Sequence, residues 1–328
     1  MQRLKIKIYL TKTKTFKDNF ARIASLNLTK GINMLKVSTL LSASVLLLTF
    51  GAFTGCGSNS KDSIESNQAN AAPSAALLVF ADQKGKIDIA GGTAHIPVMK
   101  KAAEAIMASN PNITISITGG GTGAGITKAG EGLADIGNTG RALKPQEIEK
   151  YNLVSFPFAV DGVAIAVHKE NPIANLTKEQ ASQIFSGAVK NWNELGGNDG
   201  AINLYVREDG SGTRDTFESK GLNKGTEIPQ NANVVSSNGA MKIAIAQDKN
   251  AIGYVGIGHL DDSIQGASFE GVAPTQEKTK EGAYQISRLL YMNTKGEPQG
   301  LTKLFIDYIY SDDGAEFIQQ SGYIPLPK

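Results

Sequence analysis

A unit of strand, small-residue loop and helix constrains the fold of this chain more than any other feature. Residues 87–90 and 112–118 have the residue types of short strands, and each is followed by glycines and then by a helical pattern. A third unit joins a strand at 202–207 to a helix that starts near Thr216. This repetition predicts an α/β fold in which the loops gather at the carboxyl ends of parallel strands.

The third loop, at residues 207–214, reads Arg-Glu-Asp-Gly-Ser-Gly-Thr-Arg and carries the strongest chemical signal. Its two glycines let backbone N–H groups approach a bound molecule, and Ser211 and Thr213 add hydroxyl donors. Arg207 adds a planar guanidinium that suits a tetrahedral oxyanion, and the N-terminus of the following helix favours the same charge. The segment predicts a loop that holds a small anion; the alternative is an ordinary polar turn before a helix.

Two further loops have the same character. Residues 92–94 read Gly-Thr-Ala, and residues 119–125 read Gly-Gly-Gly-Thr-Gly-Ala-Gly, with Thr122 as the hydroxyl donor. The second loop contains a G-x-G-x-x-A pattern, but Asp135 comes too early for a dinucleotide site, and no Lys-Ser/Thr pair completes a P-loop. A plain turn would explain one such loop, whereas three together are expected to surround an anion with N–H and O–H donors.

Catalysis is a poorer fit to these residues. The chain has three histidines and one cysteine, Ser211 lacks the G-x-S-x-G setting of a nucleophile, and no spacing of His, Cys and carboxylates suggests a metal site. His95 lies close to Thr93, but a histidine in a structural role is the commoner case. We therefore expect a binding protein with no metal and no cofactor, and a phosphate-ester hydrolase using Ser211 or His95 is the rival of another class.

The N-terminal region carries much of the positive charge. The first 55 residues hold nine Lys and Arg and one Asp, which leaves the other 273 residues with 24 basic and 30 acidic groups, a net charge of −6. An acidic body argues against nucleic acid as a partner. An anion site in such a chain has to be local, made by loops and helix ends.

Cys56 predicts how the chain is held at a membrane. It follows an apolar run at 46–53 and a Thr-Gly pair, a pattern that resembles a bacterial lipoprotein signal, with cleavage before Cys56 and lipid on its sulfur. A short transmembrane anchor is the alternative. Met34 followed by Lys36 would make a normal signal start, and we hypothesise that residues 1–33 are not translated.

From residue 87 to residue 326 the chain resembles the phosphate-binding proteins of bacterial phosphate ABC importers, which have the type II periplasmic-binding-protein fold. The resemblance rests on the three loops, on Ala-Asp-Ile-Gly at 134–137 followed by Arg141, on Asp161-Gly162 and on Gly-Tyr-Ile-Pro-Leu at 322–326. It implies two lobes, each a mixed sheet flanked by helices, joined by hinge crossovers. The expected division is a signal and N-terminal extension at 1–55, a lipid-anchored flexible tether at 56–85, lobe 1 at 86–160 plus 288–328, and lobe 2 at 161–287.

The resemblance also implies the phosphate ligands. They are the hydroxyls, N–H groups and arginine of the three loops, namely Thr93, Ala94, Thr122, Arg207, Ser211, Gly212 and Thr213. Where many members have an aspartate that accepts the proton of hydrogen phosphate, this chain has Gly140 followed by Arg141. We hypothesise that Asp161 supplies the acceptor and that Arg141 balances its charge, because a buried carboxylate bonds a P–O–H group and repels sulfate.

Together with the signal, the resemblance implies a non-enzymatic lipoprotein on the outer face of the cell membrane. It would capture inorganic phosphate between its lobes, close by a hinge motion and deliver the anion to the permease of an ABC importer. We expect a monomer. The nearest rival is the same fold binding another oxyanion, such as sulfate, molybdate or tungstate.

Overall fold

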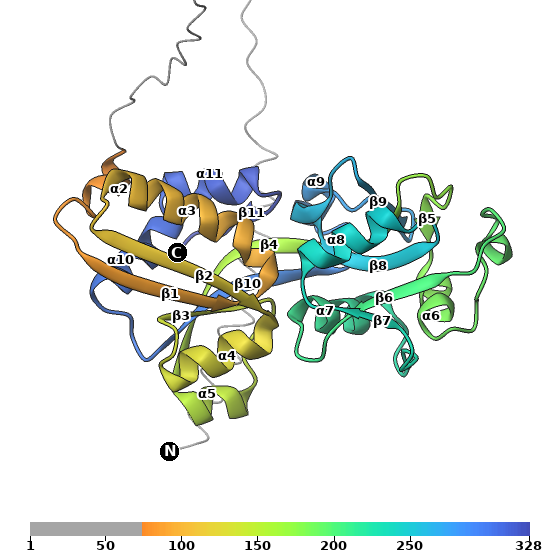
Figure 1. Cartoon of the computed structure of the whole chain (residues 1–328), viewed down its shortest axis with the longest axis horizontal. Helices are drawn as coiled ribbons and strands as arrows, with labels where there is room; N and C mark the ends of the chain where they lie inside the picture. Colours follow the sequence, from red (N-terminus) through yellow and green to blue (C-terminus); the bar gives the residue numbers. More distant parts are fainter. Residues whose placement is uncertain (1–73) are drawn as a thin grey trace, which may run out of the picture. The chain divides into compact units, whose positions relative to one another are not determined.

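Strands and helices alternate along residues 74–328, the part of the chain that the computed structural model describes (Figure 1). The strands are β1 (Gly85–Gly91), β2 (Ile113–Gly120), β3 (Ile136–Thr139), β4 (Leu153–His168), β5 (Asn175–Leu176), β6 (Asn203–Arg207), β7 (Asn233–Val235), β8 (Ala251–Gly256), β9 (Ile264–Phe269), β10 (Ser287–Lys295) and β11 (Ile324–Pro325). They form one mixed sheet in the order β2-β1-β3-β10-β4-β8-β6-β7, with β5, β9 and β11 attached off this path. The predicted α/β class is confirmed.

The helices of this part of the chain lie mainly between successive strands. They are α2 (Ala75–Leu78), α3 (Ile96–Ser109), α4 (Gly121–Glu131), α5 (Pro145–Tyr151), α6 (Lys178–Phe185), α7 (Gly212–Gly221), α8 (Asn238–Gln247), α9 (Gln276–Lys280), α10 (Gly300–Ile309) and α11 (Asp312–Gln320). Short 3₁₀ turns are η1 (Thr93–His95), η2 (Trp192–Leu195) and η3 (Ile257–His259). Parallel pairing of β1 with β2 and β3, and of β6 with β7 and β8, puts several loop-to-helix junctions at the same strand ends.

The loops are shorter than the sequence predicts, because glycines form the first turns of two helices. The pattern at residues 126–132 predicts the start of a helix, but α4 begins at Gly121. Likewise α7 begins at Gly212 rather than near Thr216. A glycine inside a helix lowers the stability of that helix by about 1 kcal/mol relative to alanine. In α4 the close packing of the helix against the sheet outweighs this cost.

β4 connects the two halves of the sheet. The residue pattern predicts two strands at 153–158 and 162–167, but a single strand of 16 residues runs through both. Its first half pairs with β10, and its second half pairs with β8 and β9. β10 runs antiparallel beside it, with Arg288 opposite Asp161. The boundaries predicted between lobe 1 and lobe 2 fall within these two strands and remain a prediction; the two names are kept below for the residues given above.

Two separate hydrophobic clusters support this division of the sheet. One packs α3, α10 and α11 against β1 and β10, and its fully buried members include Ile87, Val98 and Phe305. The other packs α6 and α7 against β4 and β8, with Phe185, Phe217 and Tyr254 in ring contact. Each half therefore has its own apolar core, with the long strands running between them (Figure 1).

The predicted tether ends earlier than expected. The sequence predicts a tether up to residue 85, but helix α2 starts at Ala75 and is capped by Ser74, whose hydroxyl accepts from the N–H of Leu77 at 3.3 Å. Phe80 is fully buried in the lobe 1 core, and the side-chain amide of Asn110 donates to its carbonyl at 2.7 Å. Ala76 and Leu77 also pack against this core, whereas Leu78 and Val79 are exposed, so burial of one side of the segment holds it in place.

The predicted signal, the hypothesis about residues 1–33 and the lipid site at Cys56 lie outside the described residues. Within residues 74–328, none of the helices combines the length and the apolar character that crossing a bilayer requires.

Candidate functional site

A small cavity lies where the loops after β1, β2, β3 and β6 converge. Its lining consists of glycines, hydroxyl side chains and basic or titratable groups: Gly92, Thr93, Ala94, His95, Gly121, Thr122, Gly140, Arg207, Ser211, Gly212, Thr213 and Arg288. The structure thus brings together the seven residues that the three loops were predicted to supply. Residues more than 100 positions apart in the sequence meet at one point.

Lobe 1 supplies two helix starts to the cavity. Thr93 lies in η1 directly after β1, and Thr122 is the second residue of α4; both are buried. The helix α4 lies close against the sheet, since a Cβ on Gly125 would be 2.4 Å from the carbonyl oxygen of Asn138. Glycines therefore let α4 direct its N-terminal N–H groups, which have no intrahelical acceptor, toward the cavity.

Lobe 2 supplies the start of α7. Ser211 is its N-cap, and the hydroxyl oxygen accepts from the N–H of Arg214 at 3.3 Å. Gly212 has to be glycine, because a Cβ there would be 2.4 Å from the hydroxyl oxygen of Thr122 in the other lobe. The helix start is thereby pressed against lobe 1.

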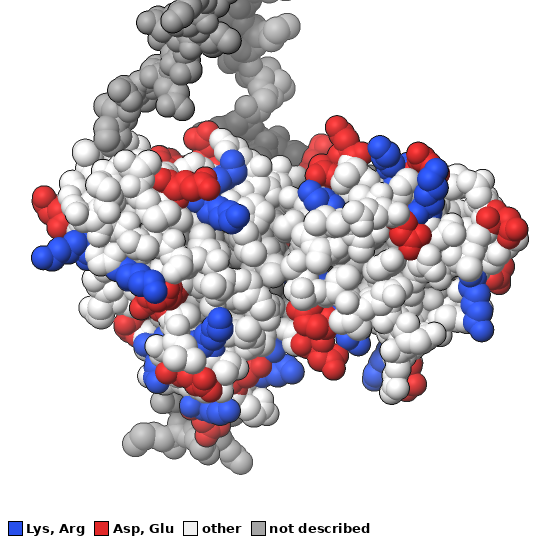
Figure 2. All heavy atoms as spheres, in the orientation of Figure 1, with Lys and Arg blue, Asp and Glu red and all other residues white. Residues whose placement is uncertain are grey.

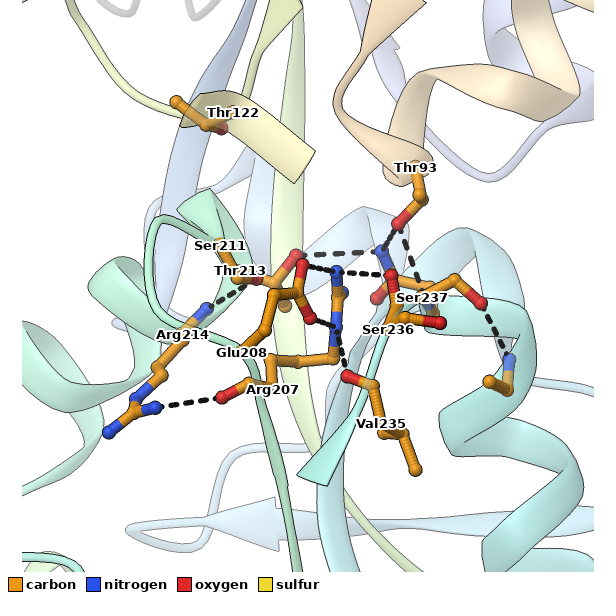
Figure 3. Close-up of polar contacts among 12 residues, drawn as sticks. Thr93, Thr122, Arg207, Glu208, Ser211, Thr213, Arg214, Val235, Ser236 and Ser237 are labelled. Carbon is orange, nitrogen blue, oxygen red and sulfur yellow. Dashed lines mark hydrogen bonds and ion pairs between the residues drawn. The ribbon is translucent and has the colours of Figure 1, made fainter. Parts of the chain in front are cut away.

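Arg207 is held by a network that leaves part of its guanidinium unused (Figure 3). Its Nε and Nη2 donate to the carboxylate of Glu208 at 2.9 and 2.7 Å, and to the carbonyls of Val235 and Ser236 at 3.1 and 3.2 Å. The side chain is only 1% exposed, and Nη1 has no hydrogen-bond partner among the described residues. A buried guanidinium N–H without an acceptor is costly, so Nη1 is suited to bind an anion.

The hydroxyls of the cavity are arranged to donate. The oxygen of Thr93 accepts from the backbone N–H and the side-chain amide of Asn238 at 3.2 and 3.1 Å, and that of Thr122 accepts from the N–H of Gly140 at 2.9 Å. A hydroxyl that accepts from the protein keeps its own proton to donate elsewhere. The cavity therefore presents donors from side chains as well as from helix starts.

Asn238 is a residue of the site that the sequence analysis missed. It is fully buried at the start of α8, and its amide lies between Thr93 in lobe 1 and Thr213 in lobe 2, at 3.1 and 3.5 Å. Its side-chain oxygen accepts from the N–H of Gly256 at 3.1 Å. The sequence feature that could have revealed Asn238 is Ser237, which follows the β-branched residues of β7 and is a favourable N-cap residue. It predicts a fourth strand-to-helix junction at this position.

His95 and Arg288 also line the cavity, although neither was predicted to bind. His95 is fully buried, and burial together with the nearby charge of Arg288 lowers its pKa to about 3, so the imidazole is neutral near pH 7. Arg288 comes from β10, and its Nε and Nη2 lie 2.9 and 2.8 Å from Oδ2 of Asp161.

The structure does not bring Arg141 and Asp161 into the lining. The guanidinium of Arg141 lies on Glu147 and Asp215, with contacts of 2.8 to 2.9 Å. The carboxylate of Asp161 is fully buried against Arg288, and burial raises its pKa although the arginine opposes this. Both charges are already paired with protein groups, which is why neither side chain turns to the cavity.

The two lobes are in contact around the cavity. The N–H of Gly123 donates to the carbonyl of Gly210 at 3.0 Å, and the ion pair between Arg141 and Asp215 joins the lobes at 2.9 Å. Thr93 and Asn238 make a third link, inside the site. The loops therefore enclose the cavity on both sides, as in the closed state of a hinged binding protein.

The positive charge of the site is local. On the face of the molecule shown in Figure 2, Lys and Arg are interspersed with Asp and Glu. Within residues 74–328, no group of three or more His, Cys, Asp or Glu side chains is placed to hold a metal ion. Charge at the cavity comes from two buried guanidinium groups and from helix starts.

A two-lobed α/β fold with a donor-lined cavity between its lobes is the architecture of a solute-binding protein, and comparison with known proteins agrees. The model of the PBP superfamily domain matches residues 79–313. The phosphate-binding protein PstS of Bacillus subtilis is 36% identical over 291 residues, covering 86% of this chain and 93% of that protein. PstS of Pseudomonas aeruginosa strain PAO1 is 31% identical over 273 residues, 74% of this chain and 84% of the relative. This chain belongs to the PBP superfamily, within the family of phosphate-binding proteins PstS.

Solved structures confirm the type II fold. A putative phosphate ABC transporter substrate-binding protein from Clostridium perfringens, with bound phosphate, is 36% identical with a TM-score of 0.70, and the match covers 74% of this chain and 100% of that one. An ABC-type phosphate transport receptor from Vibrio cholerae is also 36% identical, with a TM-score of 0.60 and the same coverage.

Proposed function

We propose that this protein is a non-enzymatic receptor that binds inorganic phosphate between its lobes and delivers it to the permease of an ABC importer. Thr93, Thr122, Ser211 and Thr213 would donate through their hydroxyls, Ala94 and Gly212 through backbone N–H groups, and Arg207 through Nη1. The support from known proteins is the phosphate-bound structure of the Clostridium perfringens relative.

The observation that carries the proposal is the unused donor capacity of a closed cavity. Nη1 of Arg207 is buried without a partner among residues 74–328, and the hydroxyls of Thr93 and Thr122 already accept from the protein. Donors with nothing to bind are unfavourable in a buried site, and a tetrahedral oxyanion supplies four acceptor oxygens. A water molecule in the cavity would accept a hydrogen bond but would not neutralise the guanidinium charge, whereas an anion does both.

Calorimetric titration of the protein, stripped of bound anion, tests this proposal. We expect saturable binding of phosphate at one site, and weaker binding of sulfate and molybdate. Tighter binding of sulfate or molybdate than of phosphate would show that the protein is a receptor for that anion instead. Sustained turnover of a chromogenic phosphate ester would contradict the non-enzymatic assignment.

Ser211, which lines the cavity, and Arg214, which lies in the same loop but outside the lining, make a pair of variants. Ser211→Ala removes one donor from the cavity and should weaken phosphate binding about tenfold. The guanidinium of Arg214 lies outside the cavity lining, where it contacts Asp209 and Glu218 at 2.9 and 2.6 Å and donates from Nη1 to the backbone carbonyl of Arg207 at 2.8 Å. Arg214→Gln removes a full charge from the same segment, and we expect a change of about twofold or less.

We also propose that the protein acts outside the cytoplasm as a monomer, held at the membrane by lipid on Cys56. The support is the sequence pattern around this cysteine. Metabolic labelling with a palmitate analogue should label the wild type and leave Cys56→Ser unlabelled. Release of the variant into the medium or periplasm, with phosphate binding intact, would separate anchoring from binding; an unlabelled wild type would rule out the anchor.

A further inference from the structure

We infer that Arg288 is a second guanidinium ligand of the anion, placed in the space left by the glycine at position 140, and that the cavity selects the doubly charged form of phosphate. This inference rests on the proposed function and names the ionic form that the site takes. It goes beyond the three predicted loops, because Arg288 belongs to the crossover strand β10.

The position of Arg288 depends on the absence of a side chain at residue 140. A Cβ on Gly140 would lie 2.6 Å from Nη1 and 3.2 Å from Cζ of Arg288. Both residues line the cavity, and Arg288 is only 8% exposed. An aspartate at position 140 would therefore compete with the guanidinium for one space, so the chain places a cation where the acceptor was expected.

Asp161 holds Arg288 in this position. The two residues face each other across the β4–β10 ladder, and Oδ2 of Asp161 lies 2.9 Å from Nε and 2.8 Å from Nη2. Nε makes the hydrogen bond, Nη2 lies at ion-pair distance without a hydrogen-bond partner among the described residues, and Nη1 lies beside Gly140. Asp161 is therefore a positioning residue that acts through Arg288, rather than the direct acceptor that the sequence suggested.

The polar lining favours oxygens that carry no proton. The hydroxyl oxygens of Thr93 and Thr122 already accept from protein N–H groups, and the two guanidinium groups can only donate. Among the described residues, none that lines this cavity is acidic. The neutral imidazole of His95 adds one acceptor nitrogen, which suits the single P–O–H group of the doubly charged form. The second P–O–H group of the singly charged form would face donors and lose a hydrogen bond, which penalises that form.

The other titratable groups near Arg288 keep their charge around neutral pH. Burial and the charge of Arg288 lower the pKa of His95 to about 3. Burial, the charge of Lys242 and the charges of the two arginines lower the pKa of His259 to about 4, and burial raises the pKa of Tyr323. Arg207 is paired with Glu208, and burial raises the pKa of Asp161 against the effect of Arg288. A pH dependence of binding near neutrality therefore belongs to the anion or to the Asp161–Arg288 pair.

Phosphate titrations on the anion-stripped full chain test this inference. The wild type should bind phosphate about tenfold more tightly at about pH 8 than at about pH 6, because the doubly charged fraction rises over this interval. Replacing Arg288 alone would leave Asp161 buried without a partner, so the informative variant is the double substitution Arg288→Gln with Asp161→Asn. It should bind at least about tenfold more weakly near pH 8 and lose most of the pH dependence.

Two further variants complete the experiment. Lys242→Gln removes a cation that lies on Asp261 at 2.7 Å, outside the cavity lining, and should keep the wild-type affinity and pH profile. Gly140→Asp puts a carboxylate in the space that Nη1 of Arg288 occupies, and exchanging this donor for an acceptor should raise the ratio of the sulfate to the phosphate dissociation constants by at least about tenfold, since sulfate has no proton to donate.

The outcomes separate the two proposals. Wild-type protein that gives no phosphate binding overturns the proposed function. Wild-type binding with an unchanged affinity and pH profile in the double variant overturns the role of Arg288 alone. If the double variant does not fold, Gly140→Asp decides: an unchanged anion preference contradicts the inference, and a widened preference for phosphate supports it.

Discussion

Lobe 1 and lobe 2 build their halves of the cavity by different means. Lobe 1 uses glycines, which bring the start of α4 against β1 and β3 and place Thr93 and Thr122 beside the buried side chains of His95 and Arg288. Lobe 2 uses a charged side chain, Arg207, held by Glu208 and by two carbonyls of the following segment. The first half is positioned by backbone packing and the second by a polar network, so different kinds of substitution should damage them.

The largest effect should come from filling the backbone contact of lobe 1. Gly125→Ala would place a Cβ 2.4 Å from the carbonyl oxygen of Asn138 and should lower the free energy of unfolding by about 3 kcal/mol. Gly123 is two residues earlier in the same helix, and a Cβ there would be 3.8 Å from its nearest neighbour. Gly123→Ala should therefore stabilise the protein by up to about 1 kcal/mol. Denaturant unfolding of both variants tests this contrast, which fails if they shift in the same direction.

The second largest effect should come from lobe 2, where substitutions should weaken phosphate binding rather than destabilise the fold. Arg207→Gln removes the charge of lobe 2 from the cavity and should weaken phosphate binding about a hundredfold, close to 3 kcal/mol. Glu208→Gln keeps the guanidinium of Arg207 but removes the charge that holds it in position, and we expect phosphate binding to weaken about tenfold. Calorimetry measures both dissociation constants, and a larger loss for Glu208→Gln than for Arg207→Gln would contradict the assignment.

Acid should destabilise lobe 1 through His95. Its pKa falls from the usual 6.5 to about 3 in the folded protein, so the unfolded chain binds more protons between these values. Stability is therefore present above pH 6.5 and is lost as the pH falls toward 3, by about 2 to 3 kcal/mol at pH 4.5. The raised pKa of Asp161 acts in the opposite direction.

Melting temperatures across this pH interval measure the effect of His95. His95→Phe keeps a ring beside Phe158, whose centroid lies 5.5 Å away, and should show a shallower loss of stability on acidification. A slope equal to that of the wild type would assign the acid sensitivity to other groups, of which His259 is the first to test.

The smallest effect should come from the surface link between the lobes. Asp215→Asn breaks the bond to Arg141 but keeps the bond between Arg141 and Glu147, which lies within lobe 1. Because Asp215 is partly exposed, closure should lose only about 0.5 kcal/mol, and phosphate binding should weaken about twofold. A tenfold loss in calorimetry would show that closure depends on this pair more than on the loops.

The sequence predicted those parts of the site whose donor groups lie on one continuous segment of the chain. The loops containing Thr93, Thr122 and Arg207 are contiguous, and their glycines and hydroxyls indicate an anion site without knowledge of the fold. The predicted roles of Arg141 and Asp161 rested on the family resemblance and on their charge. Pairing with Glu147 and Arg288 keeps them out of the lining, and nothing in the local sequence specifies those partners.

Local residue patterns determined the α/β class, most of the strands and the three donor loops of this protein, since each depends on neighbours along the chain. Only the tertiary structure decided which charges face the anion. Arg288, Asn238 and Asp161 lie on different elements from the loops, and their positions depend on the register of β10 with β4 and on closure of lobe 2 over Thr93. A buried charge is oriented by its nearest partner in space, and that partner is set by the fold rather than by the sequence around it.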